Sequence, residues 1–154
     1  DLIAYLLITV LLVPLAAAAE EYAYRGLMLR VIGSWTRNST VGLVLGIAIS
    51  SVAFALTHGT LDPYYLTWYV VLGASLAILV WRTGGIELAV LLHAVMNTVL
   101  LLSALVLHAD IPTQINARPE AVGTPMILIP AAVAVVIAAI VWATTRRSGP
   151  VTSA

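Results

Sequence analysis

The chain contains no cysteine and no lysine, and it has few charged residues of any kind. The absence of cysteine excludes disulfides, thiol nucleophiles and cysteine metal ligands. Without lysine, and with seven basic residues balanced by seven acidic ones, the chain has no basic patch of the kind that binds nucleic acid. Only 9% of residues are charged, whereas 62% are hydrophobic; a soluble domain has about 25% charged residues. These proportions predict a membrane protein with no nucleic-acid partner.

Five apolar runs are long enough to cross a bilayer as helices, because about 20 helical residues span the hydrocarbon core of roughly 30 Å. The expected fold class is therefore all-α, a polytopic transmembrane bundle of five spans with lipid as its partner. The connections are short, so residues 1–147 form one domain, followed by a disordered polar tail over 148–154. Because the chain starts at Asp1 without a methionine, we expect further helices upstream. The predicted helices cover residues 2–32, 41–58, 64–81, 86–107 and 126–143.

Local signals mark where these helices bend, begin and end. Pro14 should kink the first helix, because proline removes a backbone hydrogen bond. One residue of 38–40 is expected to cap the second helix, and Asp62-Pro63 marks the turn before the third. Small residues such as Gly42 and Gly46 would let the second helix approach its neighbours closely, so we expect it to be an interior helix.

The arginines predict the orientation in the membrane. With five spans, the arginines outside the membrane core fall on one side, except for Arg118. The positive-inside rule places that side, with the C-terminus, in the cytoplasm. Those on the common side are Arg30, Arg37, Arg82, Arg146 and Arg147. Aromatic residues at the ends of the third helix (Tyr64, Tyr65, Trp68, Tyr69, and Trp81 beside Arg82) are expected to anchor it at the interfaces. A high alanine and valine content with arginine in place of lysine is typical of a GC-rich prokaryote and predicts a prokaryotic plasma membrane.

Three ionisable side chains, Glu20, Glu21 and Arg25, lie inside the first apolar helix. A charge at the bilayer centre costs roughly 2.5–3.5 kcal/mol on insertion scales, so such a cluster indicates a site. Residues four apart are neighbours on a helix, and Glu21 therefore faces Arg25 as a structural ion pair. Glu20 lies about 100° away and has no cation at that spacing. It requires a wet pocket or a partner from another helix, which suits a carboxylate that takes a proton from water.

Further polar side chains lie on two other predicted helices. His58 ends the second helix one turn after Phe54, while His93 and Asn97 share one face of the fourth. Each alone also fits a cap or a polar contact between helices, but together with the first cluster they favour an active site. With parallel helices His58 would lie about 25 Å deep and His93 only about 10 Å. The two would then meet only if the second helix starts outside the bilayer or tilts strongly, or if residues 59–63 re-enter it.

In this order, the patterns Glu-Glu-x-x-x-Arg, Phe-x-x-x-His and His-x-x-x-Asn resemble the three motifs of the CPBP intramembrane proteases. This family includes type II CAAX prenyl endopeptidases and bacteriocin-processing or abortive-infection-type proteins. Gly26, which follows the arginine, matches as well, and the resemblance spans residues 20–97. It implies a membrane endopeptidase that hydrolyses a peptide bond of a peptide or protein substrate, either lipidated or membrane-bound.

The resemblance also implies a role for each residue. Glu20 and His58 would activate a water molecule, His93 and Asn97 would hold the oxyanion, and the pair of Glu21 and Arg25 would support the site structurally. If a metal such as zinc is present, Glu20, His58 and His93 would be its ligands. The chain lacks His-Glu-x-x-His, the direct metalloprotease pattern, so we expect no obligatory cofactor.

Two alternatives fit the same residues. Intramembrane glutamate and histidine also mark ion pathways, so the chain could belong to a transporter or a proton relay. No internal repeat is visible, as many transporters would show. In a non-catalytic membrane scaffold, the same polar groups would simply form hydrogen bonds between helices.

Overall fold

The structure, a computed structural model, describes residues 2–109 and 118–149. Within these ranges it consists of helices without strands, and five helices are long and apolar enough to span a membrane. The predicted all-α bundle of five spans is confirmed. Residues 110–117 of the polar loop and 150–154 of the predicted tail lie outside the described residues.

The first span runs without interruption from Leu2 to Gly33. Two of its segments are π-helical, and the first of these ends at Leu12, two residues before Pro14. Because proline has no N–H group and its ring clashes with the carbonyl four residues earlier, a wider turn accommodates it. The disturbance expected at Pro14 thus takes the form of a π-helical segment. The elements of this span are α1 (Leu2–Leu7), η1 (Ile8–Leu12), α2 (Val13–Glu21), η2 (Tyr22–Met28) and α3 (Leu29–Gly33).

The remaining elements begin and end close to the predicted positions. They are α4 (Ser39–Leu56), α5 (Pro63–Thr83), α6 (Glu87–Val106), η3 (Arg118–Glu120), η4 (Pro125–Ile127) and α8 (Leu128–Thr144). The Asn38 side chain caps α4 by accepting a hydrogen bond of 3.0 Å from the Val41 N–H group. Asp62 caps α5, and Gly84 ends it in the left-handed conformation with φ 81°. The helix α4 ends at Leu56, so His58 follows the helix instead of ending it.

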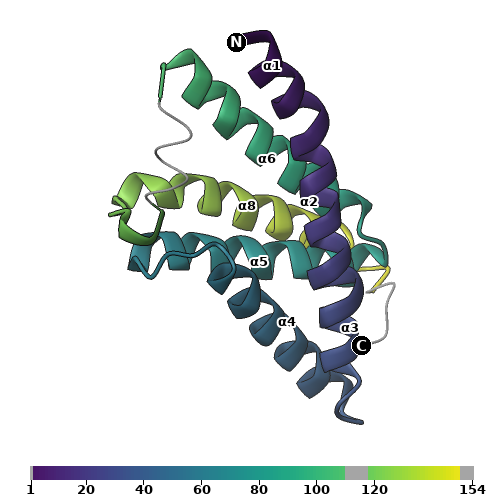
Figure 1. Ribbon diagram of the computed structural model, residues 1–154. Coiled ribbons are helices and arrows are strands. Elements are labelled where there is room, and N and C mark those ends of the chain that lie inside the picture. Colours follow the sequence, from purple (N-terminus) through teal and green to yellow (C-terminus); the bar gives the residue numbers. More distant parts are fainter. Residues whose placement is uncertain (1, 110–117, 150–154) are drawn as a thin grey trace.

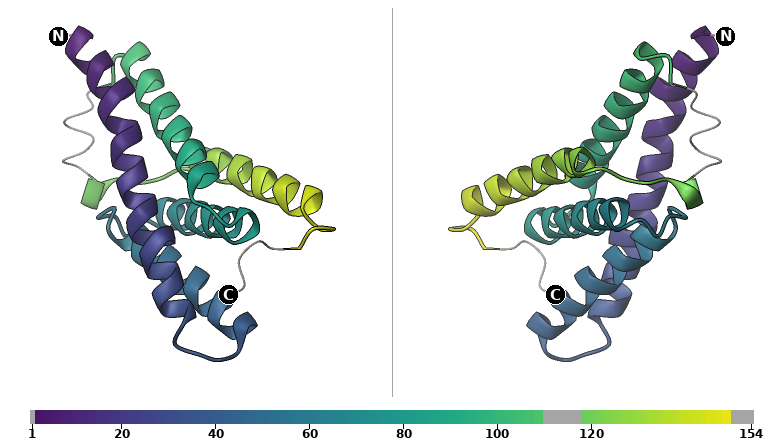
Figure 2. Two further views of the ribbon diagram at one scale, coloured as in Figure 1. Left: turned by 90° about the vertical axis from the view of Figure 1, so that its right-hand side faces the viewer. Right: turned by 90° about the vertical axis from the view of Figure 1, so that its left-hand side faces the viewer.

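The first span, α4 and α6 are inclined to α5, whereas α8 runs along α5 (Figures 1 and 2). The central helix is α5, which packs against α4 on one side and against α8 on another, while α6 packs against α2. Half of the apolar window of α5 is buried, compared with a third of that of α4. The interior character predicted for the second span therefore describes α5 better, and only one face of α4 is buried.

Two glycines of α4 bring it against α3, as the small residues predicted. Gly42 lies on the backbone of Gly33, and a side-chain carbon added at Gly46 would lie 2.8 Å from the Leu29 carbonyl oxygen. This approach replaces side-chain contacts by direct packing of one backbone on another. It fixes the end of the first span that carries the ionisable cluster.

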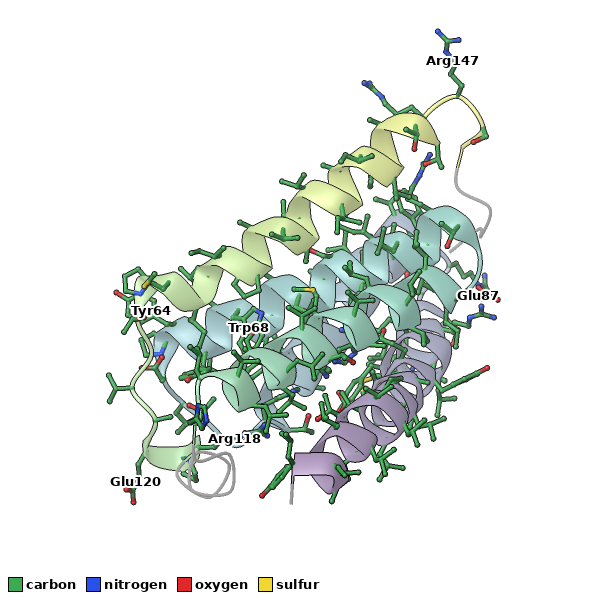
Figure 3. All side chains as sticks on the ribbon, turned by 90° about the horizontal axis from the view of Figure 1, so that it is seen from above. Tyr64, Trp68, Glu87, Arg118, Glu120 and Arg147 are labelled. Atoms are coloured by element: carbon green, nitrogen blue, oxygen red, sulfur yellow. The ribbon has the colours of Figure 1, made fainter. Side chains whose placement is uncertain are left out.

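The aromatic residues of α5 correct one expectation. Trp68 and Tyr69 are each only 6% exposed, so they are core residues and not interface anchors. At the far end Arg82 is also buried, and it donates hydrogen bonds to the hydroxyl and the carbonyl oxygen of Thr145. Position along the sequence suggested an interface, whereas the inward face of α5 and the packing of α8 along it bury these groups (Figure 3).

Replacing Gly46 by valine should destabilise the fold by about 1–3 kcal/mol, because the added carbons overlap the α3 backbone. Thermal unfolding in detergent micelles measures the effect. Ala48→Val on the exposed face of the same helix is the matched control. Equal unfolding temperatures for the two variants would contradict the close contact of α3 and α4.

Candidate active site

The site is built around the carboxylate of Glu21, which is completely buried at the end of α2. Its Oε1 atom accepts a hydrogen bond of 2.8 Å from Arg25 Nη1, so the predicted ion pair is present. The same oxygen accepts a second bond of 2.7 Å from His93 Nδ1 on α6. One carboxylate oxygen therefore joins the first span to α6 through two charge-assisted bonds.

The guanidinium of Arg25 is enclosed as tightly as its partner. It is 0% exposed, and its Cζ atom lies 4.4 Å from the centre of the Phe54 ring, which is the geometry of a cation–π contact. Arg25 belongs to the π-helical segment η2, which begins directly after Glu21. Such wider turns occur often at functional sites.

Glu20 is placed differently from its neighbour. Its side chain is 40% exposed, and its Oε2 atom lies 3.8 Å from His93 Nε2. This Oε2 atom is itself buried and has no hydrogen-bond partner among the described residues. The expected partner from another helix is therefore His93, at a distance that leaves the carboxylate able to bind a further donor.

The hydrogen bonds identify the tautomers of both histidines. A carboxylate oxygen only accepts, so the Nδ1 atom of His93 carries a proton and its Nε2 atom faces Glu20. In the same way, His58 Nδ1 donates a bond of 2.8 Å to the Phe54 carbonyl oxygen. Each imidazole therefore has its Nε2 atom available for chemistry.

Phe54 brings the two histidines together. Its ring centre lies 4.7 Å from that of His58 and 5.7 Å from that of His93. The described helices are not all parallel (Figure 2), so the different depths expected of the two histidines in a parallel bundle do not apply. Asn97 lies one turn after His93 on α6, half-buried, and its side chain forms no hydrogen bond with a described residue.

A comparison with known families now decides the family. Residues 2–99, more than half of the chain, match the family model described as type II CAAX prenyl endopeptidase Rce1-like. The chain belongs to the Rce1-like family. No curated protein and no solved structure matches it. The matched range includes each ionisable residue described above, from Glu20 to His93, together with Asn97.

Membership of the Rce1-like family confirms the resemblance found in the motifs. At the level of the family it supports a CAAX-type protease, which is a hydrolase with a peptide or protein substrate. Together with the five apolar helices, it makes the chain an integral membrane protein.

Sequence reasoning missed two residues beside the candidate site. Tyr69 of α5 stacks on His58 with ring centres 3.8 Å apart. The sequence does contain a pattern that could have indicated Tyr69. One helical face carries Tyr65, Trp68, Tyr69 and Leu72 at the spacing of a buried stripe. Arg118 of η3 (Figure 3) was the second, since its positive charge adds to the larger effect of burial in lowering the pKa of His58. No spacing rule connects Arg118 with residues so distant in the sequence.

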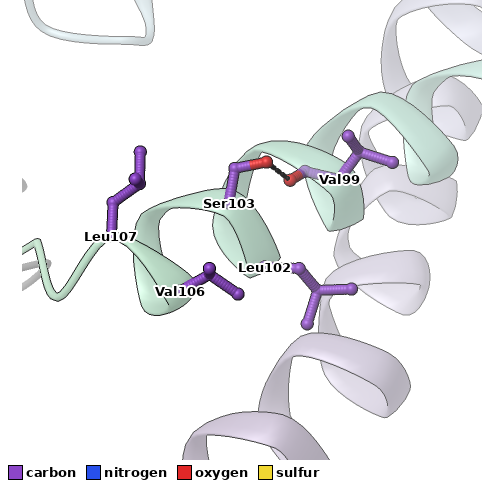
Figure 4. Close-up of a pocket in the computed structure, with 5 residues that line it drawn as sticks. All are labelled: Val99, Leu102, Ser103, Val106 and Leu107. Carbon is purple, nitrogen blue, oxygen red and sulfur yellow. Dashed lines mark hydrogen bonds between the residues drawn. The ribbon is translucent and has the colours of Figure 1, made fainter.

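A hollow of about 420 Å³ lies elsewhere, along the C-terminal half of α6 (Figure 4). Its lining is Val99, Leu102, Ser103, Val106 and Leu107. The single hydroxyl group in this lining, on Ser103, donates a bond of 2.7 Å to the Val99 carbonyl oxygen. Without a titratable group, this hollow is not a candidate for the hydrolytic centre.

The described residues do not form a metal centre. Within residues 2–109 and 118–149, no three His, Asp or Glu side chains are grouped closely enough to hold an ion. Glu20, His58 and His93, the candidate zinc ligands, therefore do not form a ligand set here. We derive no step through a metal.

Replacing Glu21 by glutamine should destabilise the protein by about 3–5 kcal/mol, because it leaves the buried charge of Arg25 without its partner. Denaturant unfolding in micelles measures the change. Glu87→Gln at the exposed start of α6 is the control. Adding Arg25→Gln to the Glu21 variant should recover part of the loss. A Glu21 variant as stable as the Glu87 control would show that the pair carries no charge.

Proposed function

We propose that this chain is an intramembrane endopeptidase in which Glu20 is the general base that activates water. The observation that carries the proposal is the Oε2 atom of Glu20, which is buried, has no partner among the described residues and lies 3.8 Å from His93 Nε2. A carboxylate with an unused lone pair beside a fixed imidazole suits the removal of a proton from water.

His58 assists Glu20 in this proposal. Burial lowers the pKa of His58 below its ordinary value, although the bond to the Phe54 carbonyl oxygen acts in the opposite direction. The imidazole is then neutral near pH 7, and its Nε2 atom can accept a proton or orient the water. Stacking on Tyr69 holds the ring in place.

His93 and Asn97 stabilise the oxyanion that forms when water attacks the peptide carbonyl group. The Nδ1–H group of His93 donates a hydrogen bond to Glu21. The Nε2 atom can therefore donate a hydrogen bond to an oxyanion only when the ring is an imidazolium. The Asn97 amide, which has no bond to a described residue, supplies the second donor.

The substrate class follows from the family and from where the site lies. A site made by membrane-spanning helices acts on a membrane-embedded or lipidated peptide. We place the chain in a prokaryotic plasma membrane with its C-terminus in the cytoplasm, as the arginine distribution suggests. Arg118 would then lie on the opposite side of the membrane.

Replacing Glu20 by glutamine should lower the rate of peptide cleavage about 10²- to 10⁴-fold, because it removes the general base. Since the side chain is 40% exposed and forms no ion pair as close as that of Glu21, the variant should unfold at the wild-type temperature. Cleavage of a membrane-reconstituted peptide is the assay, with Glu87→Gln as the control. Wild-type cleavage by the Glu20 variant would refute the proposed base.

Metal removal should leave the reaction unchanged, because the described acidic and histidine side chains form no ligand set. After dialysis against EDTA, the rate is expected within about twofold of the untreated rate, and added zinc should not raise it. A zinc-dependent protease treated in the same way is the positive control. Activity that disappears on chelation and returns with zinc would overturn this assignment.

A further inference from the structure

The Arg25 guanidinium also lies close to α5, at Gly73, a residue that none of the motifs includes. A side-chain carbon added at Gly73 would lie 3.1 Å from Arg25 Nη2. It would also lie 3.0 Å from the Cβ atom of Ser51 on α4. Both contacts are closer than packed side chains tolerate without movement, so α5 comes this near to the guanidinium only because residue 73 has no side chain.

Two other contacts already position the guanidinium. Glu21 Oε1 lies 2.8 Å from Nη1, and the ring of Phe54 covers one face at 4.4 Å. A side chain at residue 73 that displaced Arg25 would therefore disturb its contact with Glu21. Because Glu21 Oε1 also holds His93 Nδ1 at 2.7 Å, any displacement of the carboxylate would turn the imidazole that faces Glu20.

We propose that Gly73 is a positioning residue for the hydrolytic reaction. Because Gly73 has no side chain, Arg25 has room to hold Glu21, and Glu21 in turn orients His93. This inference rests on the proposed function for its effect on the rate. Its structural part, the dependence of the imidazole orientation on residue 73, stands on the contacts alone.

The test is Gly73→Ala in the full chain, with Gly33→Ala as the matched control. A carbon added at Gly33 meets its nearest neighbour at 3.7 Å, an ordinary contact. We expect Gly73→Ala to lower kcat at least about tenfold with little change in KM, since small misplacements at a reacting centre cost up to about 10²-fold. The Nδ1–H resonance of ¹⁵N-labelled His93, assigned with His93→Gln, should shift. Neither quantity should change in the Gly33 variant.

A double-mutant cycle separates positioning from simple helix spacing. Lysine at position 25 has no Nη2 atom, so Gly73→Ala should change kcat by less than about twofold in an Arg25→Lys background. An equal loss in both backgrounds would show that Gly73 only spaces the helices, and would overturn the inference. If Gly73→Ala does not fold, adding Ser51→Gly removes the Cβ atom 3.0 Å away and leaves only the Ser51 Cα atom, at 3.1 Å, to be accommodated on α4; the double variant gives the same readouts.

Failure of the proposed function is detected separately. If Glu20→Gln cleaves like the wild type, the proposed base is wrong, and the His93 resonance alone decides the role of Gly73. A shifted resonance then supports the positioning contact, and an unchanged one refutes it.

Discussion

A carboxylate and a guanidinium that are both fully buried must stay paired, because separation would leave each charge uncompensated, and this constraint organises the interior of the protein. Glu21 and Arg25 are both 0% exposed, and separating them would leave a charge uncompensated in a medium of low dielectric. Their further contacts reach α4 through Phe54, α5 through Gly73 and α6 through His93. Three helices that are distant in the sequence therefore meet on one ion pair. The relative positions of the candidate catalytic groups depend on that meeting.

The two adjacent glutamates differ because successive helical positions point about 100° apart. Glu21 points inward and has its charge met by Arg25 and His93. Glu20 is partly exposed and keeps one buried oxygen without a partner. Side chains of the same type thus receive different environments, and environment is what separates a structural carboxylate from one that moves protons. His93 lies between them, with Nδ1 toward one glutamate and Nε2 toward the other, so the structural pair directly orients a group of the proposed chemistry.

Local rules predicted the parts of this arrangement that are local. Helical spacing alone indicated that Glu21 pairs with Arg25, hydropathy indicated the five spans, and the cap and turn signals at residues 38–40 and 62–63 indicated where α4 and α5 begin. What could not be predicted is how the helices cross, because crossing angles arise from packing between distant segments. A parallel bundle would have placed His58 and His93 at different depths. In the structure, the rings of both histidines pack against Phe54. The contributions of Tyr69 and Arg118 were missed for the same reason.

Stability alone is a poor explanation for so polar an interior. Replacing a buried ion pair by well-packed apolar residues is often neutral or even stabilising by about 1–4 kcal/mol, and lipid-facing helices would accept such residues easily. The Glu21–Arg25 pair also leaves Arg25 Nε, Arg25 Nη2 and Glu21 Oε2 without hydrogen-bond partners among the described residues, which adds a desolvation cost. An arrangement chosen for stability would avoid both costs. What the pair supplies, and apolar packing cannot, is a directional hold on one nitrogen of His93. The cost is therefore best understood as the requirement for keeping that imidazole aimed at Glu20.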